Sequence, residues 1–119
     1  MLAKVLRIGQ LYDFYGALLT DKQRQCLEMH YLNDLSLAEI ADEFQVSRQA
    51  IHDILRRGEL ILEEYEAKLG LVDRYRQEQE SIRQAFEMLN DLPHDFHRLR
   101  NFGFALDLLK QLLDREEEG

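Results

Sequence analysis

A short run of polar and basic residues in the middle of the chain has side chains and spacing that could carry binding chemistry. It holds Arg48, Gln49, His52, Arg56 and Arg57. If Ile51, Ile54 and Leu55 face inward on a helix, these five side chains point outward. Arg48 and Gln49 then lie at the helix start, where side chains can bond base edges, and Arg56 and Arg57 could meet phosphates. Asp53 sits among them and would repel a polyanion, so protein contact or simple solvation of this surface stays open.

Residues 36–57 are predicted to form the two helices that present this surface. Ser36 with Glu39 makes a capping box, and Ser47 is placed to cap the second helix. Two short helices can cross closely only where a small residue lies between apolar neighbours, which is typical of a helix-turn-helix. Gln45 stands in the turn where glycine is usual, and a positive φ there would cost about 1 kcal/mol. The predicted core of the motif is Ile40, Ala41, Val46 and Ile51.

The remaining sequence predicts an all-α protein of six helices, with few residues that break helices. A helix-turn-helix domain with a core like region four of sigma factors is expected over residues 1–70, and a C-terminal helical hairpin or extension over 71–119. Two apolar stripes in the extension, Val72 to Leu89 and Leu99 to Leu113, could pack as an antiparallel hairpin or form the seam of a homodimer. The first expected helix covers about residues 3–18, and the second runs from the Thr20 cap to about residue 32. A short helix opens at Ser36, and a long one runs from the Ser47 cap to a stop at Gly70. The fifth carries the stripe from Val72 to Leu89, and the last covers about residues 95–115.

Composition narrows the function classes. The 119 residues carry a net charge of −8, which weighs against broad, non-specific binding to nucleic acid. Cys26 is the single cysteine, so an intrachain disulfide is excluded and a cytoplasmic location is expected. No apolar run approaches the ~20 residues that a membrane span requires, so membrane insertion is not expected.

Catalytic and metal-binding patterns are weak. His94, Asp95 and His97 have ligand chemistry, but no cysteine or third histidine lies near them in sequence, so no metal site is predicted. A glycine-rich phosphate loop and a nucleophile elbow are both missing, and Glu63 and Glu64 are adjacent and point in different directions. We therefore expect a non-enzymatic protein without a cofactor.

The segment LTDKQRQCLEMHYLNDLSLAEIADEFQVSRQAIHDILRRGELILEEY resembles region four of bacterial sigma factors. More closely, it resembles the YlxM family of small bacterial helix-turn-helix proteins, together with YDFYGALLTDKQR before it and EEYEAKLGLVDRY after it. This resemblance implies a regulatory or accessory protein of the signal recognition particle pathway, with Ffh, FtsY or the particle RNA as partners. The other promoter and polymerase regions of a sigma factor are missing. A DNA-binding transcriptional regulator is the alternative hypothesis.

Overall fold

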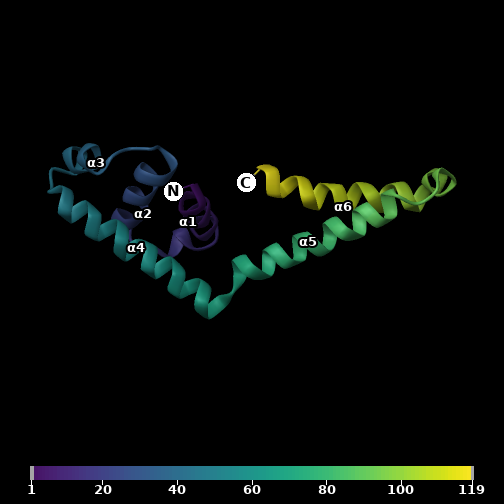
Figure 1. Cartoon of the computed structure of the whole chain (residues 1–119), viewed down its shortest axis with the longest axis horizontal. Coiled ribbons are helices and arrows are strands. Elements are labelled where there is room, and N and C mark those ends of the chain that lie inside the picture. Colours follow the sequence, from purple (N-terminus) through teal and green to yellow (C-terminus); the bar gives the residue numbers. More distant parts are fainter. Residues whose placement is uncertain (1, 119) are drawn as a thin grey trace. The chain divides into compact units, whose positions relative to one another are not determined.

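The chain folds into helices joined by short turns (Figure 1). The computed structural model describes residues 2–118, and side chains are described as far as Leu113. Every regular element in this range is helical, which confirms the predicted all-α class, and none of these helices is long and apolar enough to cross a bilayer. Contacts divide the chain into two compact units, Met1–Val72 and Asp73–Gly119. The elements are α1 (Leu2–Tyr15), η1 (Gly16–Leu18), α2 (Asp21–Leu27), η2 (Glu28–Leu32), α3 (Leu37–Phe44), α4 (Arg48–Leu69), α5 (Leu71–Asn90), η3 (His94–Arg98) and α6 (Arg100–Glu118).

The first unit is built around α4, against which α1, α2 and α3 all pack. The packing of α2 on α4 is tight at Gly58, where an added Cβ would lie 3.2 Å from Cδ1 of Leu27. Burying one large aliphatic side chain contributes about 1.5–3 kcal/mol, so the core accounts for most of the stability of this unit. The buried apolar residues are Ile8, Leu11, Tyr15, Leu19, Cys26, Leu27, Ile40, Ala41, Ile51, Leu55, Leu62 and Val72.

The helix-turn-helix forms where the sequence predicts it. The Ser36 hydroxyl accepts from the Glu39 N–H at 3.1 Å, and the Glu39 carboxylate accepts from the Ser36 N–H at 3.1 Å. The Ser47 hydroxyl caps α4 by accepting from the Ala50 N–H at 3.0 Å. Of the residues predicted to form the core of the motif, Ile40 and Ile51 are fully buried, Ala41 is 5% exposed and Val46 is half-buried.

The turn of the motif carries the strain that the sequence predicts. Gln45 has φ +56°, the left-handed region that favours glycine. Its backbone N–H donates to the Asp42 carbonyl at 3.3 Å, and its side-chain amide donates to the same oxygen at 2.8 Å. These bonds satisfy a carbonyl at the end of α3, so the turn tolerates a residue with a side chain.

The last turn of the second predicted helix differs from the expectation of a regular helix to residue 32. The α-helix ends at Leu27, and η2 continues it as a π-helix. The Asn33 N–H donates to the Glu28 carbonyl at 2.9 Å, which is the wider i to i+5 spacing. A π turn rotates the side chains that follow it, and this brings Tyr31 to α4. Local sequence gives no signal for this change, because it is stabilised by contacts with other helices.

Three tyrosine–glutamate pairs join the helices of the first unit. The Tyr12 hydroxyl on α1 donates to Glu28 on η2, and Tyr31 on η2 donates to Glu59 on α4. The third pair joins α1 to α4, where the buried Tyr15 hydroxyl donates to Glu66 at 2.6 Å. Apolar helix packing is not directional, whereas each of these bonds fixes one helix against another in a single register.

The Tyr15–Glu66 pair also fixes where the chain leaves α4. Gly70 ends α4 with φ +63°, as the sequence predicts, and α5 starts directly after it. The Glu66 carboxylate accepts from the Val72 N–H at 3.0 Å, and the Tyr15 hydroxyl accepts from the Leu71 N–H at 3.1 Å. Two N–H groups in the first turn of α5 therefore find partners in the first unit, where a helix otherwise leaves them to water or a cap.

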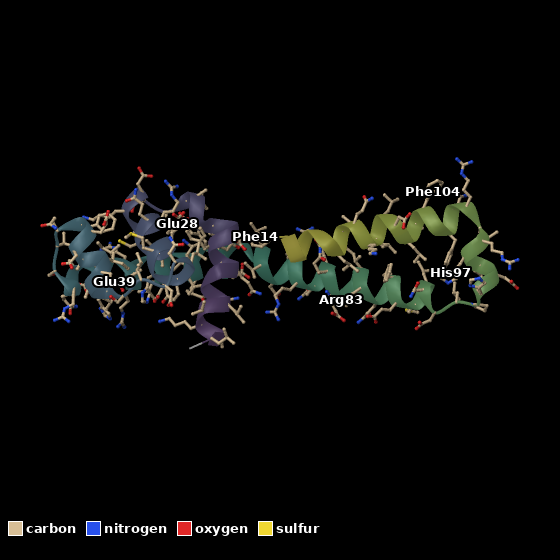
Figure 2. The ribbon with its side chains drawn as sticks, turned by 90° about the horizontal axis from the view of Figure 1, so that it is seen from above. Phe14, Glu28, Glu39, Arg83, His97 and Phe104 are labelled. Atoms are coloured by element: carbon tan, nitrogen blue, oxygen red, sulfur yellow. The ribbon has the colours of Figure 1, made fainter. Side chains whose placement is uncertain are left out.

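In the second unit, α5 and α6 run side by side in opposite directions, joined through η3 (Figures 1 and 2). Within α5 and α6 of this unit, the side chains between the two helices are partly buried, and Gln79 is 7% exposed. The Gln79 side-chain oxygen has no hydrogen-bond partner among the described residues. The half-buried stripes are Tyr75, Ile82, Phe86 and Leu89 on α5, and Phe102, Leu106, Leu109 and Leu113 on α6.

Two expectations for the last helix are wrong. The predicted helix from about residue 95 begins only at Arg100, because η3 occupies His94–Arg98 and Leu99 is extended with ψ 130°. Leu99, expected on the inner stripe, is therefore outside the helix and 58% exposed. Other large apolar side chains of α6 also face solvent, and Figure 2 shows Phe104 on the side of α6 away from α5. Along α6, Phe104, Leu108 and Leu112 recur every fourth residue and are all exposed.

Candidate partner-binding face

The five predicted binding residues all lie exposed on the first three turns of α4. Arg48, His52 and Arg56 follow one another at every fourth residue and so form one stripe. Arg57 stands about 100° around the helix from Arg56 and belongs to a different side. The α4 face, as we use the term, comprises Arg48, Gln49, His52 and Arg56.

Charge on the α4 face is uneven. In the part of the chain that the structure describes, no carboxylate lies within 4.0 Å of the guanidinium groups of Arg48, Arg56 or Arg57. Asp53 instead contacts the two remaining polar residues, since it accepts from the Gln49 amide at 3.0 Å and lies 3.7 Å from His52 Nδ1. Gln49 is therefore engaged within the helix, as the sequence did not predict, and the arginines are the groups left for a ligand.

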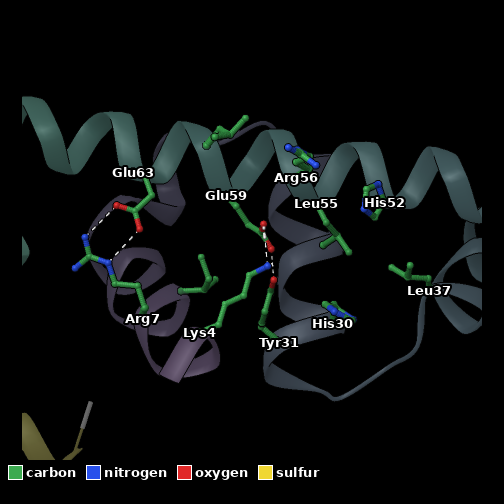
Figure 3. Close-up of a pocket in the computed structure, with 12 residues that line it drawn as sticks. Lys4, Arg7, His30, Tyr31, Leu37, His52, Leu55, Arg56, Glu59 and Glu63 are labelled. Atoms are coloured by element: carbon green, nitrogen blue, oxygen red, sulfur yellow. Dashed lines mark hydrogen bonds and ion pairs between the residues drawn. The ribbon is translucent and has the colours of Figure 1, made fainter. Parts of the chain in front are cut away.

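A hollow of about 500 Å³ opens beside the stripe, between the start of α1, η2 and α4 (Figure 3). Sequence reasoning missed it, because its walls come from segments far apart in the chain. Its lining combines cationic, carboxylate, imidazole and apolar side chains, a combination that suits a polar ligand of mixed character. The lining residues are Lys4, Arg7, Ile8, His30, Tyr31, Leu37, His52, Leu55, Arg56, Glu59, Leu60 and Glu63.

Ion pairs across the hollow join α1 to α4. Lys4 Nζ lies 3.6 Å from Glu59 Oε2, and Tyr31 donates to the other oxygen of that carboxylate. Arg7 pairs with Glu63 in a bidentate manner, with Nε to Oε1 at 3.1 Å and Nη2 to Oε2 at 3.0 Å. Glu59 is 17% exposed while the other three are more open, so the Lys4–Tyr31–Glu59 cluster is the better shielded of the two. Only the spacing of Glu59 and Glu63, one helical turn apart, could have suggested this arrangement.

Two side chains in the hollow, His30 and Tyr31, have hydrogen-bond partners that determine which of their atoms donate and which accept. His30 Nδ1 lies 2.8 Å from the Leu35 carbonyl oxygen. Because a carbonyl can only accept, Nδ1 carries the proton and neutral His30 keeps Nε2 as an acceptor. Burial, together with the hydrogen bond to Glu59, raises the pKa of Tyr31 above its ordinary value, so Tyr31 stays a hydrogen-bond donor at neutral pH.

A second hollow of about 530 Å³ adjoins the first at the start of α4. The two share Leu37 and His52, so the recessed surface runs without interruption from the Ser47 cap to Glu63. Over these turns α4 advances about 24 Å, which is long enough to accept a ligand that touches several side chains in a row.

The histidines of the second unit do not join this surface. His94 and His97 lie in η3 with nearly parallel rings 6.1 Å apart, and His97 also packs edge-on against Phe102 at 4.9 Å. Within the described residues, no three His, Cys, Asp or Glu side chains gather closely enough to hold a metal ion. In the first unit, Cys26 is buried, and burial raises the pKa of its thiol, so it is an apolar core residue.

These features define a helix-turn-helix protein with an exposed face on the second helix of the motif. The family model described as "Putative helix-turn-helix protein, YlxM / p13 like" (UPF0122) matches residues 2–99, and the chain belongs to that family. A UPF0122 protein of Geobacillus kaustophilus (strain HTA426) is 53% identical over 91 residues, which cover 76% of this chain and 79% of the relative. UPF0122 proteins of Bacillus mycoides (strain KBAB4) and Bacillus cereus (strain AH187) are 42% and 41% identical over 109 residues, covering 92% of this chain and 99% of each relative.

Proposed function

We propose that this protein is a non-enzymatic regulator of the signal recognition particle pathway in the cytoplasm, and that its α4 face contacts the particle RNA. The resemblance to YlxM proteins supports the pathway. The observation that carries the RNA contact is the pair of arginines on this face, Arg48 and Arg56, without a carboxylate within 4.0 Å in the described chain. In a chain of net charge −8, such a concentration of unpaired cations favours a local anionic ligand.

The strength of this contact follows from the number of cations. Two arginines that replace counterions give a salt dependence of about −1.4 in log affinity against log salt for a single strand, and about −1.8 for a duplex. Binding is therefore strong only at low salt, unless a protein partner such as Ffh or FtsY adds contacts. Net negative charge elsewhere on the chain suits a basic surface of that kind.

A parallel titration tests the proposal. The particle RNA, purified Ffh and FtsY, and a DNA duplex are each titrated with the protein at two salt concentrations. We expect retention of the particle RNA by the wild type, and loss of most of the salt dependence when Arg48→Ala is combined with Arg56→Ala. Lys68→Ala with Arg76→Ala removes the same charge outside the α4 face and serves as the control. Failure of all three pathway components to bind at low salt would reject the proposal.

A DNA-binding transcriptional regulator is the second candidate. It is favoured by the position of Arg48 directly after the Ser47 cap, where a recognition helix meets base edges. The bond from Gln49 to Asp53 weakens this candidate, because it engages an amide that could read adenine. Selection of DNA fragments from a random pool distinguishes the two, since a regulator enriches one sequence and an RNA-binding accessory protein enriches none.

We also propose self-association through the second unit. The exposed Phe104, Leu108 and Leu112 support it, because they form an apolar stripe on α6 beyond the residues that face α5. Sedimentation velocity over a wide concentration range tests this, with Leu108→Glu expected to give a monomer. A wild-type protein that stays monomeric at the highest concentration would exclude the homodimer.

A further inference from the structure

The hollow between α1, η2 and α4 has a lining that a simple anion does not explain. A phosphate site needs donors and cations, yet Glu59 and Glu63 place two carboxylates in the wall. The same wall holds the donors Lys4 and Arg7, and the remaining surface includes Ile8, Leu55 and Leu60. A ligand that fits must have a flat or apolar body, an edge with both donors and acceptors, and a negative group where Arg56 lies.

We propose that this hollow binds one unstacked nucleotide of a single-stranded nucleic acid, with the base inside and its phosphate at Arg56. The inference rests on the proposed function and specifies that the α4 face binds a single strand and not a duplex. A hollow of about 500 Å³ is large enough for one base and its sugar. Base edges present donors and acceptors side by side, which matches a wall that has both. Arg56 has no carboxylate within 4.0 Å in the described chain, so its guanidinium can meet a phosphate.

The carboxylates predict which bases bind best. Both oxygens of Glu63 accept from Arg7, Oε1 of Glu59 accepts from Tyr31, and Oε2 of Glu59 forms an ion pair with Lys4 at 3.6 Å. Each of the four oxygens therefore retains at least one lone pair that can accept. An exocyclic amino group can donate to such an oxygen, as cytosine N4 does to Glu and Asp side chains. Uracil has no amino group, so cytosine is expected to bind more tightly than uracil. A paired base has this edge occupied and is stacked on its neighbours, so a duplex cannot enter the hollow.

The experiment measures fluorescence anisotropy of labelled strands of about ten nucleotides, a length typical of single-strand sites, at low salt. The strands are oligo(C) and oligo(U) RNA, oligo(C) DNA, and an RNA duplex of the same length. We expect single-stranded oligo(C) RNA to bind about tenfold more tightly than the duplex, and more tightly than oligo(U). If oligo(C) DNA binds as tightly as the RNA, the protein recognises the base and the phosphate. If the DNA binds more weakly, the protein also contacts the 2′-hydroxyl of the sugar. Both results support the site.

Two pairs of variants locate the binding. Leu60 lines the hollow and is 56% exposed, whereas Leu69 on the same helix lies outside it and is 54% exposed. Leu60→Glu should weaken oligo(C) binding by about tenfold, and Leu69→Glu by less than about twofold, although both add the same charge. Arg56→Ala and Arg57→Ala form the second pair, in which only Arg56 lines the hollow. Since all four side chains are exposed, the variants are expected to fold, and far-UV circular dichroism checks this.

A direct readout uses the four histidines. Cytidine monophosphate added to the wild type should shift the proton NMR signals of His30 and His52, which line the hollow, and leave those of His94 and His97 unchanged. Strands that bind equally well in the Leu60→Glu and Leu69→Glu variants would overturn the hollow as the site while leaving RNA binding by the protein intact. Absence of binding to every strand and to the particle RNA would reject the proposed RNA contact and the hollow together.

Discussion

The tyrosine at the junction of α1, α4 and α5 gives the sharpest test of how the first unit is held together. Tyr15→Phe removes one oxygen and keeps the ring, which stacks on Tyr65 with centroids 5.8 Å apart. The missing hydroxyl takes away the 2.6 Å bond to Glu66 and the 3.1 Å bond from the Leu71 N–H. Glu66 stays buried at 8% exposure with one donor fewer, so the change is expected to destabilise the folded unit.

The magnitude can be worked from these two bonds. A hydrogen bond to a charged group contributes about 1.5–3 kcal/mol, and a backbone N–H left without a partner costs at least about 1 kcal/mol. We therefore expect the free energy of unfolding to fall by about 2–4 kcal/mol. For a unit of this size, that lowers the melting temperature by about 10–25 °C.

Urea denaturation followed by circular dichroism measures the loss, and hydrogen exchange by NMR locates it. The Leu71 amide should lose protection in Tyr15→Phe, while amides in the middle of α3 follow only the global stability. Tyr65→Phe is the matched control, because the Tyr65 hydroxyl has no hydrogen bond among the described residues, and its cost should stay below about 0.5 kcal/mol. Equal costs for the two variants, or an unchanged Leu71 exchange rate, would refute the role of the hydroxyl.

Three further predictions address the same unit. Burial and the Glu28 carboxylate raise the pKa of Tyr12 to about 12, and burial also raises the pKa of Tyr15 and Tyr31, so ionisation is disfavoured in the folded state. The free energy of unfolding should hold below about pH 10 and fall as the pH rises from there, because the unfolded chain releases these tyrosine protons first, and urea titrations that show no fall would contradict this. Ala41→Leu should destabilise the protein by about 1–3 kcal/mol or more through overpacking at the helix crossing, while the exposed Ala38→Leu should be nearly neutral, and similar urea midpoints for the two would argue against a tight crossing. Gln45→Gly should stabilise the protein by up to about 1 kcal/mol by removing the strain at φ +56°, provided that the lost amide bond to Asp42 is worth less, and a lower urea midpoint would show that the bond outweighs the strain.

Local signals were sufficient for the helix-turn-helix. Ser36, Ser47 and Gly70 act on backbone groups within a few residues of themselves, so their roles depend little on the rest of the fold. The left-handed turn at Gln45 was predictable for the same reason, from the fixed length of the connection. Helices that begin and end at such caps can be located from the sequence, and the two helices between residues 36 and 70 were located in this way.

Features that depend on distant residues were not predictable. The π turn at η2 is stabilised where Tyr12 and Tyr31 meet Glu28 and Glu59, three separate elements that no sequence window contains. The last helix begins later than predicted because Leu99 is extended after η3. The apolar stripe keeps its helical spacing through this break, so the spacing alone could not reveal it. The α4 face was found from side-chain spacing alone, but the hollow beside it was missed, since Lys4 and Arg7 reach it only after α1 has packed on α4.

The contacts of Glu59 tie the stability of the first unit to the binding surface that we propose. Glu59 accepts from Tyr31 and pairs with Lys4, so it holds η2 and α1 against α4, and it also lines the hollow. Removing it should change folding as well as the proposed binding, because the half-buried Tyr31 hydroxyl would lose its acceptor. Arg56 lines the same hollow but takes no part in joining the helices, so its loss should change binding without changing stability. The separation of these two roles along one face of α4 explains why a helix that anchors the core can still offer charged side chains to a partner.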